Sequence, residues 1–174
     1  MLTTEDAIEL IKMPKMILVD GHPQQQFIIN QEFPIDIRIE MCAVDNENLS
    51  FLWSIKQSKK MSIRMSLHCQ QEDSHIGIIR VDYNSGHKNP DEAPDNLPEI
   101  FIPYIGKEFS MNESHVHLHI TDEVQQMLWA IPIQVSEMHI KTFDASSNDV
   151  ESVIVEFAKL INVSTIIFMN KRLI

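Results

Sequence analysis

The chain has 174 residues, a formal net charge of −11, 44% hydrophobic residues and two cysteines. Its length predicts a single α+β domain over residues 1–174. Cys42 and Cys69 form no CxxC or Cys/His pattern, which indicates reduced buried thiols rather than disulfides or a cysteine zinc site. The acidic balance disfavours non-specific DNA binding, because that binding depends on neutralising phosphates.

No apolar run approaches the roughly 20 residues that a membrane span needs. The N-terminal segment carries acids where a secretory signal carries bases, and it lacks an apolar core. We therefore expect a cytoplasmic protein without a membrane partner.

Two helices are predicted near the ends of the chain. Residues 3–14 read TTEDAIELIKMP, with Thr3 or Thr4 as the N-cap and Pro14 as the stop. A loop, GHPQQQF, follows at residues 21–27. Residues 148–163 have apolar side chains at helical spacing and a capping box of Asn148 with Glu151. STIIFMN, which follows, fits either a short strand or a fraying tail.

Six segments in which apolar and polar residues alternate predict strands. They cover residues 34–41, 49–57, 61–69, 76–84, 113–120 and 128–134. The polar turns at 45–49, 58–60 and 70–74 are short, which favours an antiparallel meander. The expected architecture is an antiparallel sheet of about six strands, with the N- and C-terminal helices packed on one face.

The segment between the fourth and fifth strands, residues 85–113, contains four prolines and several apolar side chains. We expect it to be an ordered loop that packs on the domain. Long ordered loops in compact domains are usually functional.

The strand ESHVHLHI concentrates three of the eight histidines. Alternation places Val116, Leu118 and Ile120 in the core and the histidines on the opposite face. If the strands share one sheet, that open face also carries the polar halves of the other strands. Its predicted members are Asp36, Arg38, Glu40, Lys56, Ser62, Arg64, Ser66, His68, Arg80, Asp82, His115, His117 and His119. The ordinary alternative is a solvated face, with cross-strand ion pairs among such residues as Arg38, Glu40 and Lys56.

The first functional hypothesis is a phosphate- or nucleic-acid-handling protein, in the form of a metal-independent ribonuclease or a toxin-like protein. Histidines near neutral pKa can move protons in both directions, while arginines hold phosphate. The predicted catalytic residues are His87, His115, His117, His119 and Asp82. The predicted phosphate-binding residues are Arg64, Arg80 and His68. No cofactor is needed, and the partner is RNA or a nucleotide.

The hypothesis placed third, below the first two, is a transition-metal site with zinc as the cofactor. Histidines at i and i+2 of a strand can reach one ion. His115 and His117 then take a third ligand from His87, Glu113 or Asp82, and the favoured set is His87, His115 and His117.

The hypothesis placed second is a non-enzymatic binding protein. Acidic residues gather in DNENL, QQEDS, NPDEAPDN and the C-terminal helix. Such a surface can compete with nucleic acid for the basic cleft of an enzyme, which makes a protein target the alternative partner. The same class includes a protein that sequesters a nucleotide. The oligomeric state is left open.

Several short motifs occur in a fixed order in the second half of the chain. They are Arg80 and Asp82, then Gly86, His87, Asn89 and Pro90, then the three histidines, then Trp129, Ala130 and Pro132. In this order, over about half the chain, the sequence resembles an uncharacterised family of bacterial and phage proteins. The resemblance implies that these residues form one unit. By analogy alone, members of such a family are expected to occur alongside toxin and anti-defence genes.

The last expectation concerns how this unit comes together. Residues 76–84 and 113–120 are expected to be neighbouring strands, since strands close in sequence usually pair. Gly86 lets the chain turn back, which places His87 at the rim of the histidine face. Asp82 is then near enough to hold an imidazole in one tautomer or to pair with Arg80.

Overall fold

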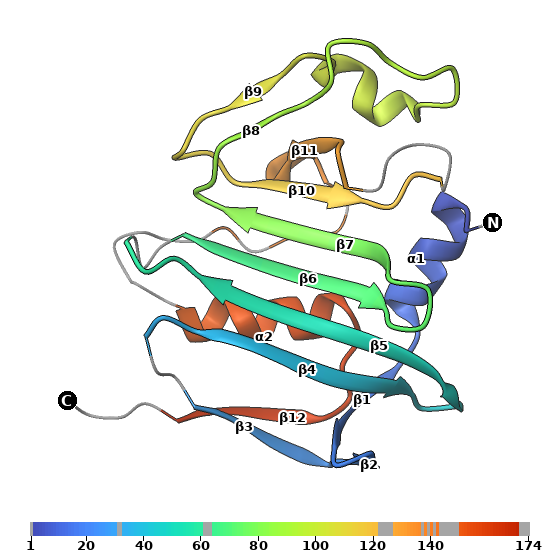
Figure 1. Ribbon diagram of the computed structural model, residues 1–174, viewed down its shortest axis with the longest axis vertical. Coiled ribbons are helices and arrows are strands. Elements are labelled where there is room, and N and C mark those ends of the chain that lie inside the picture. Colours follow the sequence, from blue (N-terminus) through green and yellow to red (C-terminus); the bar gives the residue numbers. More distant parts are fainter. Residues whose placement is uncertain are drawn as a thin grey trace.

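The computed structural model describes residues 2–30, 33–60, 64–121, 127–136, 138, 140, 142 and 150–170 (Figure 1). It is an α+β fold dominated by an antiparallel sheet of eight strands, more than the six or so predicted. In chain order these strands are β1 (Lys15–Val19), β2 (His22–Pro23), β4 (Asp36–Ala43), β5 (Asn46–Gln57), β6 (Met65–Gln71), β7 (Ile76–Tyr83), β10 (His115–Leu118) and β11 (Ala130–Pro132). Their order across the sheet is β11-β10-β7-β6-β5-β4-β1-β2.

Two small sheets and four helices make up the other described elements. β3 (Gln26–Asn30) pairs in parallel with β12 (Ile166–Asn170), and β8 (His87–Lys88) pairs antiparallel with β9 (Glu108–Phe109). The helices are α1 (Thr4–Lys12), α2 (Val150–Leu160) and the 3-10 helices η1 (Glu99–Tyr104) and η2 (Ile133–Val135). Among the described helices, none is long and apolar enough to cross a membrane.

The predicted meander is confirmed, because β4, β5, β6 and β7 are consecutive antiparallel neighbours. The first helix also begins as predicted, with Thr3 and Asp6 forming a capping box. The long segment at residues 85–113 is not a simple loop, since it contains β8, η1 and β9. Predicted residues Ser62 and Asn148 lie outside the described part of the chain.

Three parts of the chain differ from the prediction. The expected loop GHPQQQF contains β2 and the start of β3, and the expected turn DNENL already belongs to β5 from Asn46 onward. β1 was not predicted. STIIFMN resolves as β12, whose partner β3 lies far away in the sequence. Such pairing gives no local signal, because its partner strand is remote.

The core lies on the apolar face of the sheet. The ring of Trp53 on β5 stacks on Phe157 of α2 with a centroid separation of 6.0 Å. Ala7 and Ile11 of α1 belong to the same cluster of buried residues. Both cysteines are buried and free, as predicted. Burial raises the pKa of Cys69 to about 12.

Lys15, at the start of β1, is fully buried. Its ammonium donates hydrogen bonds to the carbonyls of Leu10, Ile11 and Met13 at the end of α1, at 2.6, 3.2 and 2.8 Å. It also donates to Ile161, just after α2, at 2.9 Å. Burial lowers the pKa of Lys15 to about 8, so the group is mostly protonated at pH 7. One cation therefore caps the C-terminal ends of two helices, where the helix dipole favours positive charge.

Candidate metal centre

The polar face predicted by alternation exists as a set of cross-strand neighbours. His115 pairs with Asp82, and Asp82 pairs with Ser66 on its other side. One step along the strands, His117 pairs with Arg80, which in turn pairs with His68. β7 and β10 are therefore neighbouring strands in the predicted register, and the histidines lie on the same face as Arg80 and Asp82.

The expectation of an open face is wrong for the three histidines. His115, His117 and His119 are 1%, 0% and 1% exposed. The ring of Phe109, on β9, lies 4.7 Å from the ring of His115. The β8–β9 unit thus covers this edge of the face. Alternation identifies the face of a sheet to which a side chain belongs, and it carries no information about what lies over that face.

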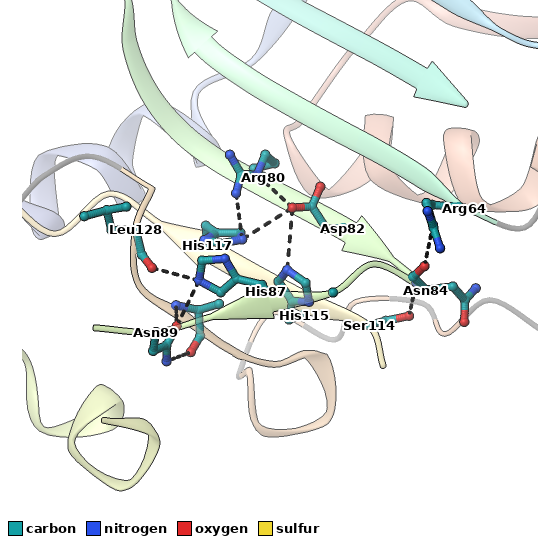
Figure 2. A network of polar contacts seen from close by, with 12 residues as sticks. Arg64, Arg80, Asp82, Asn84, His87, Asn89, Ser114, His115, His117 and Leu128 are labelled. Atoms are coloured by element: carbon teal, nitrogen blue, oxygen red, sulfur yellow. Dashed lines mark hydrogen bonds and ion pairs between the residues drawn. The ribbon is translucent and has the colours of Figure 1, made fainter. Parts of the chain in front are cut away.

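His87 reaches the histidine strand, as expected. Its ring centroid lies 5.3 Å from that of His115 and 4.7 Å from that of His117, and the last two are 5.0 Å apart. One ring nitrogen from each of the three lies within 4.8 Å of the other two. Gly86, which precedes His87, packs against the Met111 side chain, and a Cβ there would lie 2.7 Å from the Met111 sulfur. Figure 2 shows the three imidazoles grouped beside Arg80 and Asp82.

The orientation of His87 is set by two acceptors. Its Nε2 lies 2.9 Å from the carbonyl oxygen of Leu128 and 3.1 Å from Oδ1 of Asn89. Asn89 is itself buried, and its amide nitrogen donates to the carbonyls of Tyr104 and Ala130 at 2.8 Å each. Since both neighbours of Nε2 are oxygen acceptors, Nε2 carries the proton and Nδ1 keeps its lone pair.

Asp82 is the centre of the polar network drawn in Figure 2. Arg80 Nε donates to its Oδ2 at 2.9 Å, and the Nε2 atoms of His115 and His117 lie 3.6 and 3.4 Å away. Burial alone would raise the pKa of Asp82, but the two histidines and the charge of Arg80 hold it well below its ordinary range. Asp82 therefore stays ionised beside the two imidazoles.

Arg80 also contacts the cluster directly. Its Nη2 lies 2.8 Å from His117 Nε2, and a guanidinium can only donate. Nε2 of His117 is therefore the acceptor, and Nδ1 carries the proton in this arrangement. Burial lowers the pKa of His117 to about 4 and also lowers the pKa of His87. These two imidazoles are consequently neutral at pH 7, which is the form that binds metal ions.

Several cluster nitrogens have no hydrogen bond. Within the part of the chain that the structure describes, these buried atoms are His115 Nδ1, His115 Nε2 and His117 Nδ1. A buried polar atom without a hydrogen bond costs on the order of 1–3 kcal/mol. Atoms of this kind call for a physical explanation, and an ion bound between the rings is one.

Some predicted site residues lie outside the cluster. His119 Nε2 lies 3.1 Å from the carbonyl of Leu2, beside the start of α1. Arg64 Nε donates to the carbonyl of Asn84 at 3.0 Å. Glu113 forms an ion pair with Lys107 at 3.0 Å. His68 stays on the more open part of the face.

Sequence reasoning missed two parts of the site, the Phe109 ring and the Leu128 carbonyl. A backbone acceptor leaves no trace in the residue types. The HKNP motif was the signal that found His87 and Asn89.

A family model matches residues 2–163 of the chain, and its description is a family of unknown function (DUF6978). The match confirms the resemblance to a family without an assigned function and extends it from half of the chain to most of it. No curated protein and no solved structure matches the chain.

Proposed function

The chain belongs to the family of unknown function DUF6978, and from the buried histidine cluster we propose that it binds a divalent transition metal, with zinc as the reference ion. The ligands are His87, His115 and His117. The observation that carries the proposal is one ring nitrogen from each residue within 4.8 Å of the others.

The spacing of the three rings supports a shared ion. A zinc–nitrogen bond of about 2.0–2.1 Å puts an imidazole centroid roughly 3.2 Å from the ion, and tetrahedral angles then separate the centroids by roughly 5 Å. The centroid separations of 5.3, 4.7 and 5.0 Å match this spacing. Packed aromatic rings in general lie about 4.5–7 Å apart, so the feature that distinguishes this cluster is the approach of one nitrogen from each ring to within 4.8 Å of the others. Three imidazoles without a thiolate suit zinc and its first-row neighbours.

The groups around the rings support the same role. Metal-binding imidazoles usually donate their other N–H to a carboxylate or a carbonyl. The Leu128 carbonyl already serves His87 in this way. Asp82 lies within reach of Nε2 of His115 and His117. Binding through Nδ1 of His117 moves its proton to Nε2, which then donates to Asp82 in place of accepting from Arg80. No net proton is released from His117 in this exchange.

The metal joins two parts of the fold. His87 belongs to β8, and the other two ligands belong to β10. A bound ion therefore ties the covering segment, residues 85–113, to the large sheet. This role needs no solvent access. The ribonuclease hypothesis, in contrast, needs His117 to meet a 2′-hydroxyl, and that side chain is fully buried. We therefore place no RNA chemistry on the cluster.

The test is zinc binding by tag-free protein stripped with EDTA. We expect one equivalent of zinc by calorimetry. Free zinc at 100 times its Kd stabilises the fold by about 2.7 kcal/mol, which raises the melting temperature by roughly 5–10 °C for a chain of this size. Removing the zinc with EDTA should reverse the shift. Binding of less than about a tenth of an equivalent would overturn the proposal, since a structural zinc site is filled one to one.

A further inference from the structure

The exposed part of the polar face is hollowed. A cavity of about 310 Å³ lies over β4 to β7, where the face is not covered by the β8–β9 unit. Its lining includes Arg38, Ser54, Lys56, Ser66, His68 and Arg80. Arg80 alone of these also contacts the histidine cluster. The hollow is thus a separate feature that meets the metal centre at one residue.

The register explains why these side chains converge. Arg38, Ser54, His68 and Arg80 are direct cross-strand neighbours on four successive strands. Adjacent strands are about 4.8 Å apart, so Arg38 and Arg80 start roughly 14 Å from each other. Their long side chains can lean in from both sides over the short serine and histidine between them. Lys56 lies in the next row, paired with Ser66.

The hollow is positively charged although the chain as a whole carries a net charge of −11. Arg38 and Lys56 are exposed, and among the described residues no ion pair engages either of them. Asp36 and Glu40 flank Arg38 along β4, and Asp36 is also the cross-strand neighbour of Lys56. Asp82 pairs with Arg80 at the other edge of the hollow, which leaves Arg38 and Lys56 as the cations without an ion pair among the described residues. Two cations are therefore left facing solvent at its rim.

His68 responds to this local charge. Burial is the main reason that the pKa of His68 falls to about 4. The charges of Arg80 and Lys56 lower this pKa further, and the charge of Asp82 opposes them. The imidazole is neutral at pH 7 and lies within the field of both cations. It can report on an anion that enters the hollow, because a nearby negative charge favours the protonated ring.

We propose that this hollow binds the phosphate group of a small phosphate monoester. Lys56 and Arg38 neutralise the phosphate oxygens, and the hydroxyl of Ser54 donates a hydrogen bond to them. The Ser66 hydroxyl donates to Asp82 instead. Charge-assisted contacts from arginine and lysine are the usual means of holding phosphate. The cavity is at the lower end of the size range for small-molecule sites, which fits a single ligand rather than a polymer. The site stands apart from the metal proposal and does not need it.

Calorimetry with inorganic phosphate and with adenosine monophosphate tests the proposal. Lys56→Gln and Arg38→Gln should each weaken binding of both probes at least about tenfold, since one charged hydrogen bond contributes about 1.5–3 kcal/mol. Lys159→Gln, on α2, is the matched control and should bind as the wild type does. Arg80 is left unchanged because it contacts His117. NMR of the His68 ring should show its pKa rising when either probe binds.

Three results would overturn the proposal. The first is that wild-type protein binds neither probe at millimolar concentration. The second is that it binds a 20-nucleotide RNA but not the two small probes, which would make the face a polymer-binding surface. The third is that Lys159→Gln weakens phosphate binding as much as Lys56→Gln does, which would mean that binding depends only on the total charge of the protein. Zinc titration of Lys56→Gln should match the wild type, so the failure of one proposal can be told from the failure of the other.

Discussion

Zinc should no longer stabilise the His117→Gln variant. The amide keeps much of the volume of the imidazole but removes one of the three nitrogen ligands. Because changes in the outer shell alone already weaken metal binding 10- to 100-fold, loss of a direct ligand should weaken zinc binding by more than about 100-fold. A thermal melt with and without zinc measures this, and the shift expected for the wild type should vanish.

The matched control is His22→Gln, because His22 is exposed on β2 and lies outside the cluster. This variant should keep the full zinc shift. A His117→Gln protein that is still stabilised by one equivalent of zinc would place the ion elsewhere in the chain. The thermal melt of the metal-free His117→Gln variant shows whether that variant folds. If it does not fold, the double variant His87→Gln/His115→Gln replaces it in the zinc experiment.

Replacing Lys15 with methionine should lower the free energy of unfolding by about 3 kcal/mol. Each carbonyl left without a donor costs about 1–3 kcal/mol, and removing the cost of burying an ammonium offsets part of that sum. The four carbonyls that lose their donor belong to the C-terminal ends of α1 and α2. Methionine fills most of the space, so the loss comes from hydrogen bonding rather than from a cavity. Urea denaturation followed by circular dichroism gives the difference.

Lys12→Met is the comparison for this variant. Lys12 lies on α1, is largely exposed, and its ammonium pairs with Glu9. Its replacement should change stability by no more than about 0.5 kcal/mol, because exposed ion pairs contribute little. Equal effects of the two substitutions would mean that Lys15 does not hold the two helix ends together.

The meander β4 to β7 was predictable because each strand alternates over at least seven residues and the turns are short. The pairing of β7 with β10 also followed from the sequence, although the segment between them has structure of its own. From that pairing came the most useful prediction, the contact of His87 with His115 and His117. Local periodicity and one glycine turn were sufficient for it.

Other features could not be read from the sequence. β1 has the short sequence KMILV, and nothing in it indicates that its lysine points into the protein. β3 and β12 form a parallel pair across more than a hundred residues, which no local pattern can reveal. The burial of His115 and His117 depends on β8 and β9, two strands of two residues each. Elements this short leave almost no periodic signal.

The positively charged side chains of the polar face also have surroundings that the sequence did not predict. Arg64 was expected to hold phosphate, but it precedes β6 and contacts the Asn84 carbonyl. Arg38 and Lys56 were predicted members of the polar face, with ordinary cross-strand ion pairs as the alternative. They line the hollow, because the cross-strand register brings them together with Arg80. Register between strands is set by the whole sheet, and single-strand patterns do not contain it.

The most direct test of the metal centre is an X-ray absorption spectrum of the zinc-loaded, tag-free protein. We predict a nitrogen or oxygen shell at about 2.0 Å, outer-shell scattering from three imidazoles and no sulfur. A sulfur shell at about 2.3 Å, which would place Cys42 or Cys69 on the ion, would contradict the assignment. So would a spectrum that requires fewer than two imidazoles.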